Sequence, residues 1–173
     1  MKDRQINRSF NFYLKRMGQQ ELPEITIYTD GAARGNPGPG GYGVVLMSGS
    51  HRRELSQGFQ LTTNNRMELM AAIVGLEALK VIPSLVTIYT DSKYVADSVE
   101  KGWIFDWVKI RFKGKKNSDL WKRFLEVYRR HRVRFIWVKG HASIPENERC
   151  DQLAVEASLQ LILLDDSGYQ PDK

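Results

Sequence analysis

The sequence has almost no cysteine and no long apolar run. Its single cysteine, Cys150, excludes an internal disulfide and is typical of a reducing compartment. A lone cysteine is a reactive thiol or, more often, a small core residue. No apolar stretch is long enough to cross a bilayer, and no cysteines and histidines have the spacing of a zinc site. We therefore expect a cytoplasmic protein without a membrane segment. The length of 173 residues suits one domain.

Acidic residues are scarce in one stretch, residues 101–140. This stretch has 13 Lys and Arg against Asp106, Asp119 and Glu126, a net charge of +10; because the whole chain carries +6, the remainder carries −4. Aromatic residues are interleaved with the basic ones: Trp103, Phe105, Trp107, Phe112 and Trp121. A charge run is commonly a solvated face, but cations mixed with flat rings favour a nucleic-acid partner.

Residues 25–30 and 86–91 are nearly the same peptide, Ile-Thr-Ile-Tyr-Thr-Asp and Val-Thr-Ile-Tyr-Thr-Asp. Their β-branched and aromatic composition predicts two buried strands. If these strands are parallel neighbours in register, Asp30 and Asp91 lie about 5 Å apart at carboxyl ends, where open α/β sheets bind ligands. Two carboxylates this close share a proton or hold a cation. We therefore predict a metal site.

Strand and helix patterns alternate along the rest of the chain, which predicts an α/β or mixed sheet. We expect strands at 25–30, 41–47, 52–61, 86–91 and 133–138, and helices at about 63–80, 118–130 and 145–164, with two short helices flanking the basic, aromatic segment. Residues 1–23 are polar and basic; we expect a flexible extension or a basic arm rather than an organelle presequence. Residues 24–164 would form the catalytic domain and residues 165–173 a tail.

Two further acids and one histidine lie where this architecture could bring them to the same site. Glu68 and Asp151 each lie early in a predicted helix, where the helix dipole alone would favour an acid. Four converging acids would repel one another without a divalent cation, and carboxylate oxygens select Mg²⁺ or Mn²⁺ over zinc. His141 lies in a glycine-containing loop and is either a proton shuttle beside that metal or simply solvated.

Several motifs, all in the same order, resemble those of type 1 ribonuclease H of the bacterial kind, from about Glu24 to Gln170. The motifs are Tyr28-Thr29-Asp30-Gly31, Gly35-Asn36-Pro37-Gly38-Pro39-Gly40-Gly41-Tyr42-Gly43, Thr62-Thr63-Asn64-Asn65-Arg66-Met67-Glu68-Leu69, Thr90-Asp91-Ser92, Trp137-Val138-Lys139-Gly140-His141 and Glu146-Asn147-Glu148-Arg149-Cys150-Asp151. This resemblance implies a ribonuclease H-like fold, a five-stranded mixed sheet of order 3-2-1-4-5 with helices on both faces.

The resemblance also implies an activity and its residues. The reaction would be hydrolysis of the RNA strand of an RNA/DNA hybrid, leaving 5′-phosphate and 3′-hydroxyl ends. Two Mg²⁺ ions, with Mn²⁺ as a substitute, would be held by the four acids Asp30, Glu68, Asp91 and Asp151, and Asp30 would bridge them. His141 would assist proton transfer or product release. The protein would act as a monomer on a hybrid duplex.

The resemblance assigns substrate contacts to both strands. Asn64, Asn65 and the backbone near Gly31 would contact RNA in the minor groove, although helix-start chemistry alone explains the two asparagines. Asn36 and Thr63 would bind a DNA phosphate and Trp103 a deoxyribose, and Asn117 would also contact the substrate. Residues 101–117 correspond to a basic protrusion that is shorter here than in longer bacterial members, with Asp106 where many have asparagine.

Two alternative functions remain open. An integrase-like nuclease also uses a few acids and two metals, but it usually carries additional DNA-binding domains. A non-catalytic hybrid-binding module is favoured when one of the four acids is lost, and all four are present here.

Overall fold

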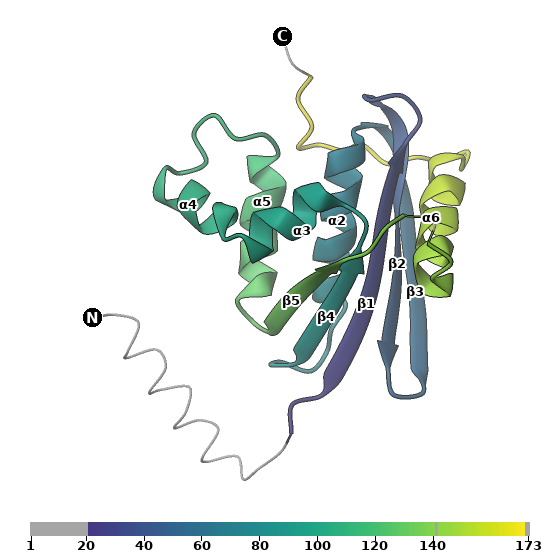
Figure 1. Cartoon of the computed structure of the whole chain (residues 1–173). Coiled ribbons are helices and arrows are strands. Elements are labelled where there is room, and N and C mark those ends of the chain that lie inside the picture. Colours follow the sequence, from purple (N-terminus) through teal and green to yellow (C-terminus); the bar gives the residue numbers. More distant parts are fainter. Residues whose placement is uncertain (1–20, 141, 172–173) are drawn as a thin grey trace.

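A five-stranded sheet forms the centre of the computed structural model, which describes residues 21–140 and 142–171 (Figure 1). The antiparallel strands are β1 (Glu24–Ala33), β2 (Gly38–Ser48) and β3 (His51–Thr62), joined as a meander. The strands β4 (Leu85–Thr90) and β5 (Arg132–Trp137) run parallel to β1. The strand order is β3-β2-β1-β4-β5, which confirms the mixed sheet expected from the sequence.

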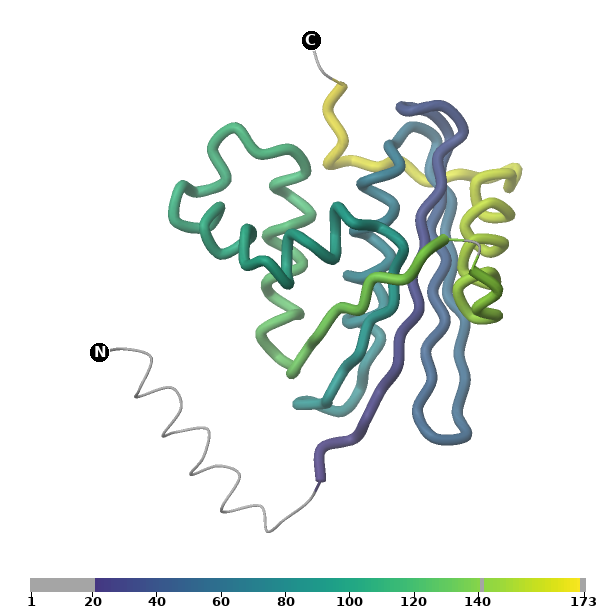
Figure 2. Tube along the Cα trace, viewed as in Figure 1, coloured from purple at the N-terminus to yellow at the C-terminus, as the bar shows by residue number. Residues whose placement is uncertain are grey.

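Helices cover the two faces of the sheet unequally (Figures 1 and 2). One face carries α2 (Asn64–Glu77), α3 (Lys93–Glu100), α4 (Trp103–Lys109) and α5 (Ser118–Tyr128). The other face carries α6 (Pro145–Ser158), which packs against β1, β2 and β3. The main core lies under α2 and α5 and includes Ile27, Ile88, Trp121 and Phe124. Within the described residues, no helix is both long and apolar enough to span a membrane.

Two glycines let the helices approach the sheet closely enough to position acidic residues. A Cβ atom at Gly31 would overlap the backbone of Met67 and Glu68, so α2 lies directly against β1 at this point. A Cβ atom at Gly43 would overlap the carbonyl of Cys150, so α6 lies equally close to β2. The buried Cys150 is therefore a core residue where α6 contacts the sheet.

The chain after α6 returns to the edge of the sheet. The helix expected to reach Leu164 ends at Ser158, so that expectation is wrong. The Leu164 amide donates to the Gly58 carbonyl at 3.0 Å, and the Gln60 amide donates to the Leu164 carbonyl at 2.8 Å. An extended segment can satisfy these groups of the edge strand, whereas a continuing helix cannot. This path brings Asp166 to the start of α2.

Candidate active site and nucleic-acid cleft

Asp30 and Asp91 are brought together by the parallel pairing of β1 and β4. In this pairing Thr29 lies opposite Thr90, so the two aspartates occupy the next positions at the same edge of the sheet. Asp30 is buried, and its Oδ1 accepts a hydrogen bond of 2.7 Å from the Gly31 amide. The repeated peptide of the sequence therefore produces the expected pair of carboxylates.

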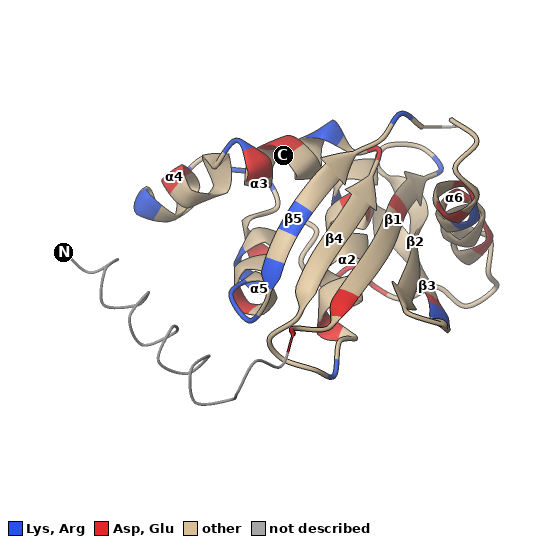
Figure 3. Ribbon diagram, turned by 60° about the horizontal axis from the view of Figure 1, so that its bottom comes forward, with Lys and Arg blue, Asp and Glu red and all other residues tan. Residues whose placement is uncertain are grey.

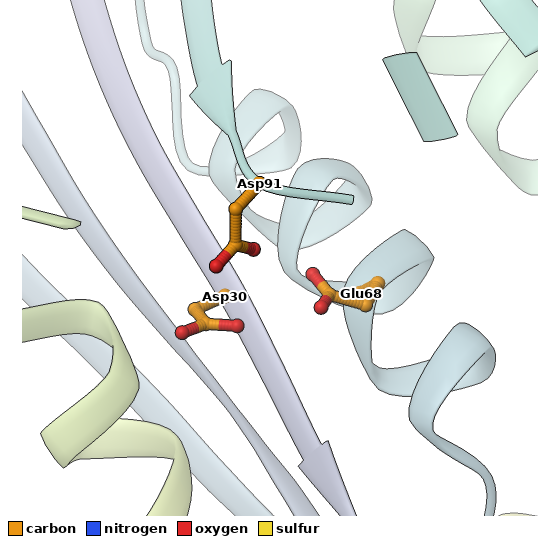
Figure 4. Close-up of side chains that lie close together, drawn as sticks. All are labelled: Asp30, Glu68 and Asp91. Carbon is orange, nitrogen blue, oxygen red and sulfur yellow. The ribbon is translucent and has the colours of Figure 1, made fainter. Parts of the chain in front are cut away.

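Glu68 completes a group of three carboxylates. It projects from α2, and one oxygen each from Asp30, Glu68 and Asp91 lies within 4.8 Å of the others (Figure 4). Burial, followed by the charge of Asp91, raises the pKa of Asp30 to about 7. Burial and the charges of Asp30 and Asp91 raise the pKa of Glu68 well above its usual value. Three acids in this arrangement are electrostatically unfavourable without a cation.

The carboxylate group fits a divalent metal ion. Glu68 Oε2 is buried and has no hydrogen-bond partner among the described residues. A buried oxygen without a donor is costly, and a cation would satisfy it. Several oxygen ligands from carboxylates are the donor set that Mg²⁺ prefers. The geometry therefore supports a metal site at Asp30, Glu68 and Asp91.

The structure describes one of the two remaining catalytic candidates. Asp151 is on α6, outside the trio within 4.8 Å, but its charge contributes to the raised pKa of Asp30. His141 lies outside the described residues. The preceding Gly140 passes close to the site, because a Cβ atom there would be 2.7 Å from Asp91 Oδ2. The loop that carries the histidine therefore starts beside the carboxylates.

The comparisons with known proteins agree with this geometry. The RNase H family model matches residues 23–159 of the chain. The chain belongs to the ribonuclease H family. It is 58% identical over 156 residues to the "Ribonuclease H" of Trichodesmium erythraeum (strain IMS101), which covers 87% of this chain and 99% of that protein. It is 51% identical over 155 residues to the "Ribonuclease H" of Aeromonas hydrophila, covering 87% of this chain and 99% of the relative.

Solved ribonuclease H structures share the fold. LC9-RNase H1, described as a type 1 RNase H with the type 2 active-site motif, aligns with a TM-score of 0.73 at 31% identity, covering 82% of this chain and 74% of that one. LC11-RNase H1 in complex with RNA/DNA hybrid aligns with a TM-score of 0.61 at 28% identity, covering 77% and 95%. The resemblance to type 1 ribonuclease H inferred from the motifs is confirmed.

Most of the predicted substrate residues of this ribonuclease H family member lie at the start of α2. The Thr63 side chain caps α2 by accepting from the Arg66 amide at 3.4 Å, and Asn36 Oδ1 accepts from the Asn64 amide at 3.1 Å. A cleft of about 590 Å³ is lined by Asn36, Thr63, Asn65, Lys115, Lys116, Asn117 and Tyr169, among others. Helix capping and substrate binding are therefore compatible uses of the same residues.

Trp103 lies apart from this cleft. It begins α4, is 43% exposed, and has the Lys101 ammonium 5.1 Å from its ring centroid. Asp106, also on α4, pairs with Lys109 at 2.6 Å on the surface. The acid that departs from the family pattern is thus already paired within the protrusion.

The sequence reading missed a second buried charge cluster beneath the cleft. The Arg66 guanidinium donates to Asp166 through Nε at 2.6 Å and to Asp119 through a terminal nitrogen at 2.7 Å. Burial by itself lowers the pKa of Arg66, but the hydrogen bonds that its guanidinium donates to the two carboxylates outweigh burial and raise it. Asp166 lies in a short polar segment that gives no sequence signal of burial, which is why this partner was missed.

Proposed function

We propose that this chain is an endoribonuclease that hydrolyses the RNA strand of RNA/DNA hybrids, leaving 5′-phosphate and 3′-hydroxyl ends. The observation that carries the proposal is the group of three mutually repelling carboxylates, Asp30, Glu68 and Asp91, in a member of the ribonuclease H family. A buried group of this kind has no structural use without a cation, since it costs stability. Relatives named "Ribonuclease H" and a neighbour in complex with RNA/DNA hybrid support the same activity.

The proposed cofactor is a pair of Mg²⁺ ions, with Mn²⁺ as a substitute, held by Asp30, Glu68, Asp91 and Asp151. When bound, these cations lower the pKa of the attacking water and stabilise the leaving 3′-oxygen. Asp30 would help to hold both ions, because the charges of both Asp91 and Asp151 act on it and, after burial, raise its pKa. His141 then moves a proton at the reacting phosphate or assists product release.

Strand discrimination rests on the first turn of α2. Asn65 precedes Glu68 by three residues, about 4.5 Å along a helix, so RNA held there lies next to the carboxylates. We assign Asn64, Asn65 and the Gly31 backbone to the RNA strand. We assign Asn36, Thr63 and Asn117 to the DNA strand in the cleft, together with Trp103 on the protrusion.

Cleavage of a short labelled hybrid tests this function. DNA/DNA and RNA/RNA duplexes are incubated alongside it, in Mg²⁺ and in EDTA. Metal-dependent internal cuts in only the RNA strand of the hybrid are expected. Asp97→Asn, the same change at an acid that pairs with Lys101 on α3, is the matched control for Asp30→Asn and should keep activity. Binding without cleavage would point to a silent module, and cleavage of DNA to an integrase-like enzyme.

Outside the site we propose a monomer that acts in the cytoplasm, with residues 24–164 as the catalytic domain. The proposed tail, residues 165–173, is anchored to that domain by the ion pair of Asp166 with Arg66. Residues 1–20 lie outside the described part of the chain. From their sequence, which is rich in Lys and Arg, we propose that residues 1–23 add salt-sensitive affinity. Removing them should raise KM at low salt and leave kcat unchanged. An unchanged KM would exclude this role.

A further inference from the structure

One half of the sheet has an uncovered face. The helix α6 covers β1, β2 and β3 on its side of the sheet, whereas no described helix lies over β4 and β5 on that side (Figure 3). Tyr28 packs against Cys150 and Leu153 of α6, so its side chain lies on the α6 face of the sheet. The strand register then places Tyr89, opposite Tyr28, and Arg134, opposite Thr87, on this same face.

The uncovered face is basic. A cleft of about 650 Å³, where β4 and β5 begin, is lined by Arg132 and Arg134 of β5 and by Arg129, which follows α5. Glu24 is the one acidic residue among the described residues that line it. Arg134 Nε donates to Thr87 Oγ1 at 2.9 Å, which fixes the guanidinium on the sheet. These arginines belong to the basic stretch 101–140 of the sequence, but the fold separates them from the protrusion: Arg132 and Arg134 lie on β5 at the sheet edge, whereas α4 packs against α3 and projects beyond that edge (Figure 1). The basic residues of stretch 101–140 therefore form two separate surfaces, one on the protrusion and one at the sheet edge.

Aromatic residues connect this basic cleft with the carboxylates. The rings of Tyr28 and Tyr89 stack at 4.8 Å between centroids and 14° between planes. Each tyrosine lies two residues before a catalytic aspartate, Asp30 or Asp91, and alternation places the tyrosine and the aspartate on one face. The face therefore leads from the reacting site, past an aromatic pair, to three arginines over about 20 Å, the length of a six-residue strand.

We propose that this face binds an unpaired stretch of the RNA strand that continues from a hybrid held in the active site. The inference rests on the proposed function. Phosphates match the arginines, and cations combined with aromatic rings are typical of single-strand binding. Continuity with the carboxylates favours nucleic acid over an acidic peptide, and favours RNA because the cleaved strand is the one that lies at the carboxylates. The enzyme would thus prefer hybrids that border single-stranded RNA.

Binding measured in EDTA tests the inference without cleavage. Fluorescence anisotropy gives Kd for a blunt hybrid and for hybrids with about 12 unpaired nucleotides at either RNA end or at a DNA end. We expect an extension at one RNA end to lower Kd about tenfold. The double variant Arg129→Gln/Arg134→Gln should lose most of this gain while binding the blunt hybrid as wild type does. Tyr89→Leu should lose part of it and Tyr89→Phe none.

The control variant is Arg52→Gln/Arg53→Gln, which removes the same charge from β3 at the opposite edge of the sheet. It should keep the full gain. No gain at either RNA end, an equal gain for a DNA extension, or an equal loss in the control would each overturn the inference. The inference would also be overturned if the variant Arg129→Gln/Arg134→Gln lost binding to an acidic peptide but kept its binding to the RNA extension. If the wild-type protein binds the extended hybrid more tightly but does not cut the hybrid in Mg²⁺, the proposed function is overturned instead.

Discussion

Arg66 and Glu68 lie two residues apart in α2 and are almost equally buried, with 2% and 5% of their surfaces exposed. Arg66 has two acidic partners, Asp166 and Asp119, and its charge is compensated inside the protein. Glu68 lies among other acids, and one of its oxygens has no donor within the described part of the chain. The same turn of helix thus carries one satisfied and one unsatisfied buried charge.

The difference separates two uses of buried charge. The Arg66 cluster joins three distant segments, the starts of α2 and α5 and the residues after α6, so it contributes to the fold. The Glu68 cluster opposes the fold when its carboxylates are charged, and it is compensated when a cation or a proton binds. A variant in the first cluster should therefore affect stability and spare chemistry. A variant in the second should impair chemistry without lowering the stability of the metal-free protein.

The largest effect is expected from Asp30→Asn. Removing this carboxylate from the metal site should lower kcat by a factor on the order of 10⁴, equivalent to about 5 kcal/mol of transition-state stabilisation. Hybrid binding should persist, because the basic residues of the cleft and protrusion are untouched. Single-turnover cleavage and anisotropy on the same preparation measure both. Residual activity near that of the wild type would show that Asp30 does not hold the metal.

The same variant should make the metal-free protein more stable. Asp30 has a raised pKa of about 7 against an ordinary value of 3.8, so the folded state binds the extra proton between these pH values. The contribution of Asp30 to stability is therefore greatest at low pH and is lost as the pH rises through this window. The advantage of Asp30→Asn in urea unfolding should grow from pH 4 to pH 7. If the gain in free energy of unfolding were the same at every pH, it would contradict the repulsion assigned to Asp30 and its acidic neighbours.

Arg66→Met should have the next largest effect, on stability. It leaves the carboxylate of Asp166, which is 3% exposed, without its cation, and breaking a buried pair costs about 3–5 kcal/mol. The kcat of the folded protein at low temperature should be nearly unchanged. The control is Arg123→Met, which removes an equally short ion pair to Glu77 at the surface and should cost at most about 1 kcal/mol. Equal losses in the two variants would contradict the role of burial.

The effect of Mg²⁺ on thermal stability should distinguish the Glu68 cluster, which would bind the ion, from the Arg66 cluster, which would not. A ligand present at about 100 times its Kd stabilises the folded state by about 2.7 kcal/mol. We expect Mg²⁺ to raise the Tm of the wild type and of Arg66→Met, and to raise that of Asp30→Asn far less. Thermal unfolding with and without EDTA measures this. A similar shift in Asp30→Asn would place the cation elsewhere.

Much of this could be predicted from sequence because local patterns determine it. The repeated strand peptide placed Asp30 beside Asp91, since parallel pairing in register leaves no other arrangement. The end of the last helix could not be predicted, because the residues after Ser158 pair with the edge of β3 through backbone groups, which carry no side-chain signature. Asp166 was missed for a different reason: its side-chain partner Arg66 lies 100 residues away in the chain, and no local pattern reports so distant a contact.

The split of the basic stretch 101–140 shows a second limit. Net charge along a sequence reports how many cations are close in the chain, not which face they occupy. Residues Lys115 and Lys116 line the cleft at the start of α2, whereas Arg132 and Arg134 lie on β5 at the edge of the sheet. Because α5 lies between the lysines and the arginines in the chain, the two sets lie on different surfaces, and this becomes evident only from the fold.

Tyr94→Phe should give the smallest effect and tests whether the satisfied cluster reaches the substrate. The Tyr94 hydroxyl accepts from Trp121 Nε1 at 2.8 Å and from Asn117 Nδ2 at 3.1 Å, and Asn117 Oδ1 in turn accepts from Arg66 at 3.4 Å. Losing the hydroxyl should cost about 1 kcal/mol of stability. Because it also frees the Asn117 amide, KM for the hybrid should rise a few-fold while kcat holds. Tyr128→Phe, another half-buried ring, is the control and should leave KM unchanged. If KM rises equally in both variants, Asn117 is positioned by packing. The Arg66 cluster then stabilises the fold but has no role in substrate binding.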